Sequence, residues 1–367
     1  MQLGIFDLIK AQYTTVPPVP NVDLSGKTVI VTGANVGLGF EAAKHFAKLN
    51  PGKLILACRN KEKGDAAVIG LSKFSDRKLH YFNEVSIPAI KQETGFQDVE
   101  LWLLDLGSFA SVRSFAERFE KEGGRLDILV ENAANAPTFD YVEFTNDGWE
   151  ASVQVNDLST FLLALLLLPR MLETAERHNT TPRLVVLSSE VLYWAVVERS
   201  LFDAPNPIRE YGHKDHLKNT YQITKRKPEV DDGPSNFDPN PSILVWNVFF
   251  VRALNDRLHR KPIIVNAANP GYCYSALRRN FTGFRLVFDR LMELFLARST
   301  EAGGRIPVWA AVGAEEKKDE LRGAYINLMK GKKDQDKFWN TLIEELGQVE
   351  PKVLQIVKEN LTPPVTN

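Results

Sequence analysis

The sequence predicts a single-domain α/β protein in which helices cover both faces of a doubly wound parallel sheet. Three observations predict this fold: short apolar, β-branched segments alternate with helical patterns, the first such segment ends in a glycine-rich turn, and no Pro/Gly-rich linker divides the chain. Right-handed strand–helix–strand units place helices on both faces of a sheet. We therefore expect the 367 residues to form three layers, α/β/α.

Six segments have the composition of buried parallel strands, because each is a short apolar run. In order they are Thr28–Thr32, Lys53–Cys58, Val99–Leu104, Asp127–Val130, Arg183–Leu187 and Pro262–Ala267. Helical patterns lie between them at Leu38–Leu49, Ser108–Lys121, Asp147–Arg177 and Leu244–Arg260. We expect an N-terminal extension over 1–24, the α/β domain over 25–330 and a helical C-terminal extension over 331–367.

Two segments interrupt stretches that would otherwise each form one helix. Val68–Pro88 separates KEKGDAA from AIKQETG, and Arg226–Ile243 separates YQITK from LVWNVFFVRALNDRL. The second segment holds four prolines. Proline inside a helix costs about 3 kcal/mol, so we expect a loop there. Our hypothesis is that one or both segments are either surface insertions or translated introns.

Composition and charge exclude several classes of protein. Lys and Arg number 45 against 46 Asp and Glu, so the net charge gives no electrostatic attraction for nucleic acid or for an anionic membrane. Two cysteines and scattered histidines predict neither a disulfide framework nor a metal site. The N-terminus lacks the pattern of a secretion signal, and the most apolar run, Phe161–Pro169, falls short of the ~20 residues of a membrane span. We expect a cytoplasmic protein without a transmembrane segment.

A glycine-rich turn, TGANVGLG, follows the first predicted strand from Thr32 to Gly39 and opens the first helix. Gly33 allows a tight turn, Gly37 lets the backbone approach a pyrophosphate at the helix N-terminus, and Gly39 lets the helix pack close to the strand. A plain loop is the alternative, but the strand–turn–helix context predicts a dinucleotide site.

The end of the second strand favours NADP(H) over NAD(H). An NAD site usually has an acid at this position, about 20 residues after the glycines, where this chain has Arg59. A guanidinium binds a 2′-phosphate through charge-assisted hydrogen bonds, whereas a carboxylate would repel it. A solvated surface arginine is the alternative.

These features resemble the short-chain dehydrogenase/reductase family, single-domain type, and further matches lie between Ser25 and Tyr325. The ACRN end of the second strand and the long gap from Ser189 to Tyr221 resemble the retinol-dehydrogenase-like and WW-domain-oxidoreductase-like branch, which includes many fungal members. The resemblance implies a Rossmann fold. It also implies cofactor contacts from Gly33, Asn35, Gly37, Leu38, Gly39, Arg59, Asp105, Asn132, Tyr221, Lys225, Pro270 and Gly271.

The resemblance further implies that Ser189, Tyr221, Lys225 and Asn156 are catalytic. A phenol has a pKa near 10, so Tyr221 exchanges a proton at neutral pH only if its phenolate is stabilised. Lys225 is four residues later, on the same face of a helix. Ser189 would hydrogen-bond the substrate oxygen, and Asn156 would hold a water that resupplies protons. The expected activity interconverts a carbonyl and an alcohol by hydride transfer.

Several of these residues have a structural alternative. Ser188 and Ser189 satisfy a strand end equally well, and Asn156 fits an ordinary buried polar residue. Asp105 either accepts from adenine or N-caps the next helix, and Asn132 is expected to steady neighbouring strands.

Glu131-Asn132-Ala133-Ala134 departs from the Asn-Asn-Ala-Gly that the family usually has after the fourth strand. If this position needs a positive φ, Ala134 costs about 1 kcal/mol; otherwise the change is mild.

The segment Tyr272–Leu296 follows Pro270-Gly271 where the family builds its substrate lid, and its apolar and aromatic residues predict a hydrophobic substrate. A packed core helix is the alternative.

The rival function is a catalytically impaired NADP-binding sensor or scaffold, in which Arg226–Ile243 disrupts the helix that carries Tyr221. Residues 1–12 or the lid are candidates for peripheral membrane association. The apolar run Phe161–Leu168 is a candidate for contacts in a homodimer or homotetramer.

Overall fold

The central feature is a parallel sheet of six strands in the order β3-β2-β1-β4-β5-β6. The computed structural model describes residues 9–10, 12–59, 87–135, 142–189, 203–215, 241–259, 261–278, 283–313, 315–324 and 332–362. The strands are β1 (Thr28–Thr32), β2 (Lys53–Cys58), β3 (Val99–Leu103), β4 (Ile128–Glu131), β5 (Arg183–Leu187) and β6 (Ile264–Ala268). This order is the doubly wound Rossmann topology, so the predicted fold class is confirmed.

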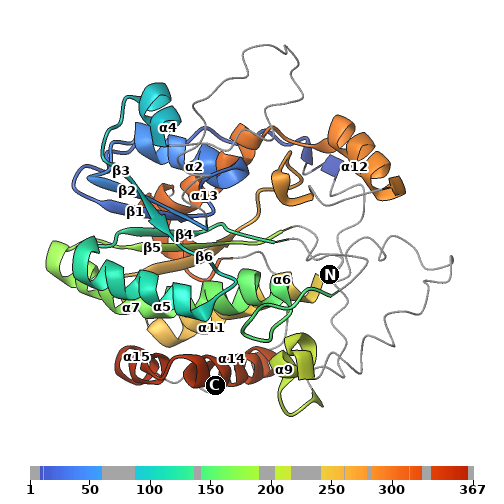
Figure 1. The fold of residues 1–367 in the computed structure, drawn as a ribbon. Coiled ribbons are helices and arrows are strands. Elements are labelled where there is room, and N and C mark those ends of the chain that lie inside the picture. Colours follow the sequence, from blue (N-terminus) through green and yellow to red (C-terminus); the bar gives the residue numbers. More distant parts are fainter. Residues whose placement is uncertain are drawn as a thin grey trace.

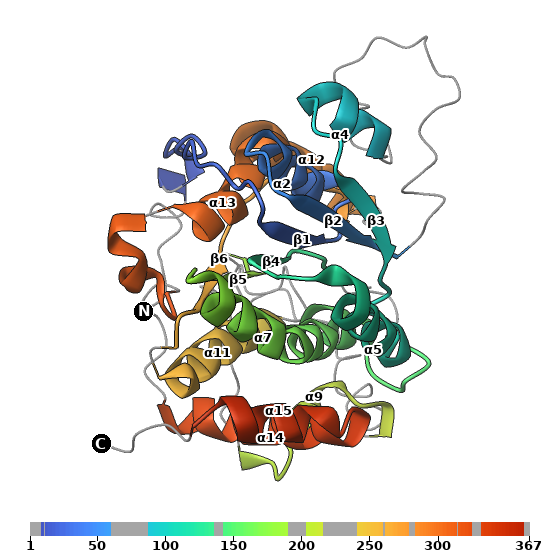
Figure 2. The same cartoon turned by 90° about the vertical axis from the view of Figure 1, so that its left-hand side faces the viewer.

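Helices cover both faces of the sheet (Figures 1 and 2). One face carries α2 (Gly37–Lys48), α4 (Ile87–Thr94) and α13 (Thr300–Val312), and the other carries α5 (Phe109–Arg118), α7 (Ser159–His178) and α11 (Pro241–Leu258). Side chains alternate between the faces along each strand, so Val29 and Val31 enter one hydrophobic core while Ile30 enters the other.

The predicted element boundaries agree with the structure except at a few ends. β4 lies one residue later than predicted, and β6 begins two residues later and ends one residue later. α11 begins at Pro241, so the loop predicted over Arg226–Ile243 is wrong for its last three residues. Proline is tolerated there because the first N–H groups of a helix have no intrahelical partner. Residues 216–240 and 60–86 lie outside the described residues, and with them most of both interrupting segments.

The long helix predicted over Asp147–Arg177 begins later and is not regular. It starts with α6 (Ala151–Val153), passes through a π-helical turn at Gln154–Leu158 and continues as α7. A second π-helical turn, Phe119–Gly123, ends the helix that contains α5. Such turns are frequent near functional sites.

The α6–α7 helix, Ala151–His178, is long and apolar enough to cross a membrane, but 89% of its most apolar window is buried inside the protein. Phe161 stacks on Phe250 of α11 with ring centroids 4.2 Å apart. The side chains from Phe161 to Leu168 are all buried within the chain, so a contact between subunits through them, as the sequence suggested, is not available on this fold.

Two C-terminal helices, α14 (Lys332–Val349) and α15 (Lys352–Asn360), add a layer outside α7 and α11 (Figure 1). Phe338 of α14 is fully buried and contacts the rings of Phe161, Trp246 and Phe249. α9 (Pro207–Gly212) joins this layer, where Arg209 pairs with Glu345 at 2.6 Å.

Candidate functional site

The predicted site residues gather at the carboxyl edge of the sheet, because all six strands are parallel. One or more of them follows each strand: Gly33 after β1, Arg59 after β2, Asp105 after β3, Asn132 after β4, Ser189 after β5, and Pro270 and Gly271 after β6. The strand order reverses between β1 and β4, which is where sheets of this topology bind ligands. The fold therefore brings these residues to one edge.

The turn between β1 and α2 has the geometry of a phosphate cradle. Gly33 and Gly37 have φ angles of +64° and +63°, a region that favours glycine. A Cβ at Gly37 would meet no atom of the described residues within 4 Å, so these residues leave the space beside this backbone open. No side chain caps the N-terminus of α2, whose first N–H groups are left for a ligand. These features fit a pyrophosphate.

Gly33 and Gly39 are needed for a different reason, which is close packing against the loop after β4. A Cβ at Gly33 would lie 2.9 Å from Ala133 Cα, and one at Gly39 would lie 2.6 Å from the Gly33 carbonyl and closer still to the Asn132 amide. Asn132 Nδ2 donates to the Thr32 carbonyl at 2.8 Å. Asn132 therefore ties β4 to β1, the structural role that the sequence predicted for it.

Leu38 and Asn35 complete the turn. The Leu38 side chain faces α13, where a Cβ at Gly303 would lie 2.5 Å from its Cδ2. Backbone groups of Ala34 and Asn35 hydrogen-bond the thiol of Cys58 at the end of β2. Burial raises the pKa of Cys58 to about 12, so this thiol stays protonated and serves packing rather than chemistry.

The Thr32 hydroxyl is the centre of a buried network. It accepts from the backbone N–H groups of Asn132 and Ala133 at 2.9 and 3.0 Å and donates to Glu131 Oε2 at 3.2 Å. Glu131 is 2% exposed, and its other oxygen, Oε1, has no hydrogen-bond partner among the described residues. Burial raises the pKa of Glu131 to about 8. The sequence showed the unusual residue here but gave no sign of its burial.

Ala134 takes the place of the family's usual glycine at little cost. Its φ is not among the positive values of the described non-glycine residues, and its side chain is exposed. The milder of the two predicted outcomes for this position is therefore the one observed.

Arg59 is exposed and follows β2 directly, beside the glycine turn, since Ala57 pairs with Thr32 in the sheet. This position would let its guanidinium pair with a 2′-phosphate on a dinucleotide that lies over the turn. This placement agrees with the prediction, and cofactor preference itself stays a prediction.

Asp105 folds its own loop. Its Oδ1 accepts from the Gly107 N–H at 2.9 Å, and its backbone N–H donates to Ser111 Oγ at 2.9 Å. The N-cap of α5 is Ser108, so the alternative that Asp105 caps this helix is wrong. A contact between Asp105 and adenine stays a prediction.

Asn156 lies in the π-helical turn and holds the loop after β4. Its Nδ2 donates to the Asn135 carbonyl at 2.9 Å, and its Oδ1 accepts from the Asn135 N–H at 2.7 Å. This reciprocal pair is a structural use of the side chain that the sequence left open as an alternative. A water held by Asn156 for proton relay stays a prediction.

Ser188 and Ser189 follow β5. Ser188 is 6% exposed and its N–H donates to the Ala268 carbonyl of β6 at 2.9 Å, whereas Ser189 is half-buried. Ser189 is thus the more accessible of the two, in line with the preference given to it. Tyr221 and Lys225 lie outside the described residues, so their placement relative to Ser189 stays a prediction.

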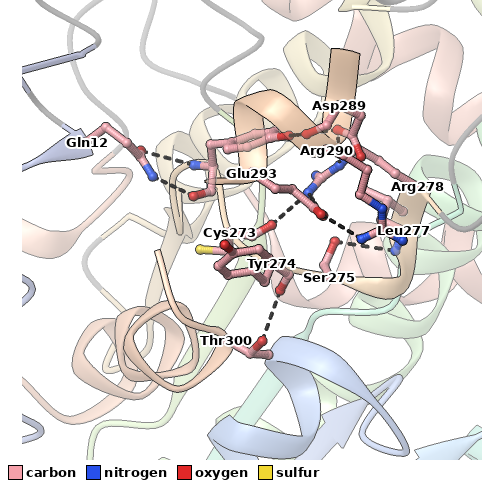
Figure 3. Close-up of polar contacts among 11 residues, drawn as sticks. Gln12, Cys273, Tyr274, Ser275, Leu277, Arg278, Asp289, Arg290, Glu293 and Thr300 are labelled. Atoms are coloured by element: carbon pink, nitrogen blue, oxygen red, sulfur yellow. Dashed lines mark hydrogen bonds and ion pairs between the residues drawn. The ribbon is translucent and has the colours of Figure 1, made fainter. Parts of the chain in front are cut away.

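Residues from the N-terminus clamp the loop after β6, a contact that no signal in the sequence indicated. The side chain of Gln12 hydrogen-bonds both the N–H and the carbonyl of Tyr272, and Arg298 donates to the Pro270 carbonyl at 3.3 Å and to the Gln12 carbonyl at 3.2 Å. Figure 3 shows Gln12 beside this loop. Gly271, with φ of +75°, leaves space that a Cβ would take from Arg298 and Gln12.

The segment predicted as a substrate lid contains α12 (Gly283–Leu296). Its exposed side chains include Leu291, Leu294 and Phe295, which are 52–66% exposed, so the alternative of a packed core helix is wrong. Tyr272, at the start of this segment, donates its phenol to Asp289 at 2.7 Å. Burial raises the pKa of Tyr272, so this tyrosine does not replace Tyr221 as an acid.

Among the described residues no group of three or more His, Cys, Asp or Glu side chains is arranged to hold a metal ion.

Comparison with known proteins agrees with this geometry. A family model described as short chain dehydrogenase matches residues 83–192. A short chain dehydrogenase/reductase of Cryptosporiopsis sp. (strain 8999) is 31% identical over 355 residues, which cover 92% of this chain and 95% of that protein. A short-chain dehydrogenase of Penicillium roqueforti is 30% identical, covering 96% of this chain and 85% of that protein.

The fold is also similar to that of a solved actinorhodin polyketide ketoreductase variant with NADPH. The TM-score is 0.54 at 16% identity, covering 84% of this chain and 98% of that one. That likeness concerns the fold, whereas the fungal relatives match over most of both sequences. On the strength of those relatives, this chain belongs to the short-chain dehydrogenase/reductase family of oxidoreductases.

Proposed function

We propose that the protein is an NADP(H)-dependent oxidoreductase that interconverts a carbonyl and an alcohol on a small, hydrophobic substrate. The proposal rests on the phosphate cradle at Gly37 together with Arg59. Arg59 is exposed at the end of the neighbouring strand β2, where an NAD site usually has an acid. The structurally similar ketoreductase was solved with NADPH, which supports the same choice of cofactor.

The described residues fit a dinucleotide. The N-terminus of α2 would hold the pyrophosphate, and Arg59 would pair with the 2′-phosphate. When bound, NADPH supplies the hydride for reduction of the carbonyl carbon. The chain would supply everything else: the cradle, the orientation of the substrate and the proton.

Tyr221 would donate that proton to the carbonyl oxygen. Lys225 would hold the phenol pKa near the working pH through its positive charge, and Ser189 would donate a hydrogen bond to the same oxygen as negative charge develops there. Asn156, through its hydrogen bonds with Asn135, would hold the loop after β4 in place beside these catalytic residues.

A second function has an observation in its favour. α11 begins at Pro241, well beyond Lys225, and the segment between them holds further prolines. If Tyr221 and Lys225 are not held rigidly, the protein would bind NADP(H) and turn over poorly, as a sensor or scaffold. In either case we place the protein in the cytoplasm. A homodimer or homotetramer, if one forms, would use a surface other than the buried Phe161–Leu168 run.

The test combines cofactor binding with turnover. We expect NADPH to bind, with binding detected by nicotinamide fluorescence, and to be oxidised with hydrophobic ketones or aldehydes. The Tyr221→Phe variant should keep cofactor binding and lose about 100-fold or more of the rate. Tight binding with no turnover on any carbonyl would favour the sensor, and full activity in Tyr221→Phe would refute the role of Tyr221.

A further inference from the structure

Exposed apolar side chains are concentrated on one helix of this protein. The structure describes ten large hydrophobic side chains that are exposed, and seven of them lie on α12 or directly beside it. Five are on α12 itself, one is on the turn before it, and Tyr13 donates its phenol to the Phe295 carbonyl at 2.6 Å. The α12 face, as we call it, consists of Tyr13, Leu277, Leu286, Val287, Leu291, Leu294 and Phe295.

The helix is fixed with this face outward, because its inner face is charged. Asp289 and Glu293, one turn apart, are 8% and 4% exposed. Both pair with Arg278, at 2.7 and 3.2 Å, as Figure 3 shows. Turning the apolar side inward would break this buried ion cluster and leave uncompensated charges. The exposure of the α12 face is therefore built into the packing beneath it.

The charges around the α12 face match an anionic lipid surface. Both acids of α12 point inward, so its outer side shows no described carboxylate. Arg290 is 54% exposed and pairs at 2.8 Å with Glu293, which is itself buried, and Lys10 is exposed one turn before Tyr13, so the charged groups exposed here are cations. Anionic headgroups attract such cations next to a membrane, and aromatic residues such as Tyr13 and Phe295 suit the headgroup level.

The shape of this region also favours a bilayer over a second copy of the chain. α12 lies at the periphery of the molecule, away from the layers that cover the sheet (Figures 1 and 2). An amphipathic helix of this kind lies flat in the membrane interface with its apolar side immersed. In a two-fold contact the same face would meet itself, and its exposed cations would face no exposed carboxylate of α12, because Asp289 and Glu293 are buried.

We propose that the α12 face docks the protein on the surface of an anionic membrane. Resting on the proposed function, this docking has a use: α12 belongs to the segment that follows Pro270-Gly271, so an apolar substrate would pass from the lipid to the site without crossing water. The docking itself does not depend on catalysis.

The test is co-sedimentation of the full-length protein with vesicles of phosphatidylcholine, with and without phosphatidylserine. We expect binding to the anionic vesicles. A combined Leu291→Ser, Leu294→Ser, Phe295→Ser variant should bind the anionic vesicles at least about tenfold more weakly. The matched control is Leu103→Ser with Leu354→Ser, which removes two leucines of 54% and 50% exposure elsewhere and should leave binding unchanged. Melting temperatures of all variants check that they fold.

Three results would overturn the proposal. They are no binding to either vesicle, equal binding by the wild type and the α12 variant, and a vesicle-free dimer that the α12 substitutions dissociate in sedimentation velocity. The Arg59→Ala variant separates this proposal from the proposed function, because it should lose NADPH affinity and still bind vesicles as the wild type does.

Discussion

Glu131 is the residue whose environment differs most from what its sequence position suggested. It ends β4 beside the glycine turn, is buried, and has a pKa raised to about 8 by burial. A carboxyl that keeps its proton places no negative charge near the expected phosphates. We infer that the site tolerates Glu131 because the group is neutral at and below pH 7.

Glu131 predicts a measurable pH dependence of stability. Its pKa rises from an ordinary 4.5 in the unfolded chain to about 8 in the fold. Between these values the folded state holds a proton that the unfolded state lacks, so the free energy of unfolding falls by about 1.4 kcal/mol per pH unit as pH rises. The contribution is fully present below the unfolded pKa and lost by the folded pKa.

Glu131→Gln should remove this slope, since an amide does not titrate. Denaturant titrations from pH 5 to 8 should show the wild type losing stability relative to the variant, even if the unpaired amide adds a constant offset. Asp157, whose pKa burial also raises, is present in both proteins and cancels. Parallel curves for the two proteins would contradict the assignment.

At this scale the sequence predicted what depends on local geometry. Gly33, Gly37 and Gly39 were assigned from their spacing, and Asn132 was expected to steady the strands. The clamp of Gln12 on Tyr272 joins residues 260 positions apart, so no local pattern indicates it. Burial of Glu131 depends in the same way on elements distant in sequence.

At the scale of elements, the β1–α2 turn shows how packing and propensity compete. Alanine normally stabilises a helix interior by about 1 kcal/mol relative to glycine. At Gly39 a Cβ would collide with the Gly33 carbonyl and the Asn132 amide, and overpacking of this kind costs about 1–3 kcal/mol. The collision therefore outweighs the gain in propensity.

Gly39→Ala should accordingly lower the free energy of unfolding of the cofactor-free protein, as measured in urea. Gly37→Ala is the matched control without a collision: none of the described atoms lies near its Cβ, so its cost should be backbone strain of about 1–2 kcal/mol. Its main effect should be weaker NADPH binding. A Gly39→Ala protein as stable as the wild type would show that the turn is looser than described.

The segment from Arg226 to Ile243 gives the second prediction at this scale. Its deletion joins Lys225 to Leu244, so that Tyr221 and Lys225 would continue into α11. α11 is anchored by Asn247, whose Nδ2 donates to the Leu187 carbonyl at the end of β5 at 3.3 Å. A tyrosine held on such a helix is better positioned for proton transfer.

We expect the deletion protein to fold and to reduce carbonyls at least about tenfold faster than the full-length chain. The rates are compared at saturating NADPH, with thermal melting as the control for folding. An unfolded or slower deletion protein would show that the segment is an integral part of the enzyme. Sequencing of the mature messenger RNA decides separately whether the segment is a translated intron.

Strands and helix types were predictable because their hydrophobic periods are local. The π-helical turn at Gln154–Leu158 was not, because the residues there continue an ordinary helical pattern. The apolar residues of α12 fitted either a lid or a core helix, so the sequence left its orientation open. The ion pairs of Arg278 show which side of α12 faces inward.

At the scale of the whole molecule, the C-terminal helices decide which surfaces remain. α14 and α15 cover α7 and α11 with large apolar side chains such as Phe338 and Leu342, so one side of the protein is closed. The carboxyl edge of the sheet and the α12 face lie elsewhere on the molecule. The resemblance predicted the sheet and its cofactor edge, while this covering layer follows from contacts between distant parts of the chain.

An isotope experiment tests directly whether the protein transfers a hydride between NADP(H) and a carbonyl carbon, as we propose. The protein is incubated with a hydrophobic ketone and NADPH that carries deuterium at the transferring position of its nicotinamide ring, and the product is analysed by mass spectrometry and NMR. We predict an alcohol with one deuterium on the carbinol carbon. An alcohol without deuterium at that carbon, or no alcohol under conditions in which NADPH is bound, would contradict it.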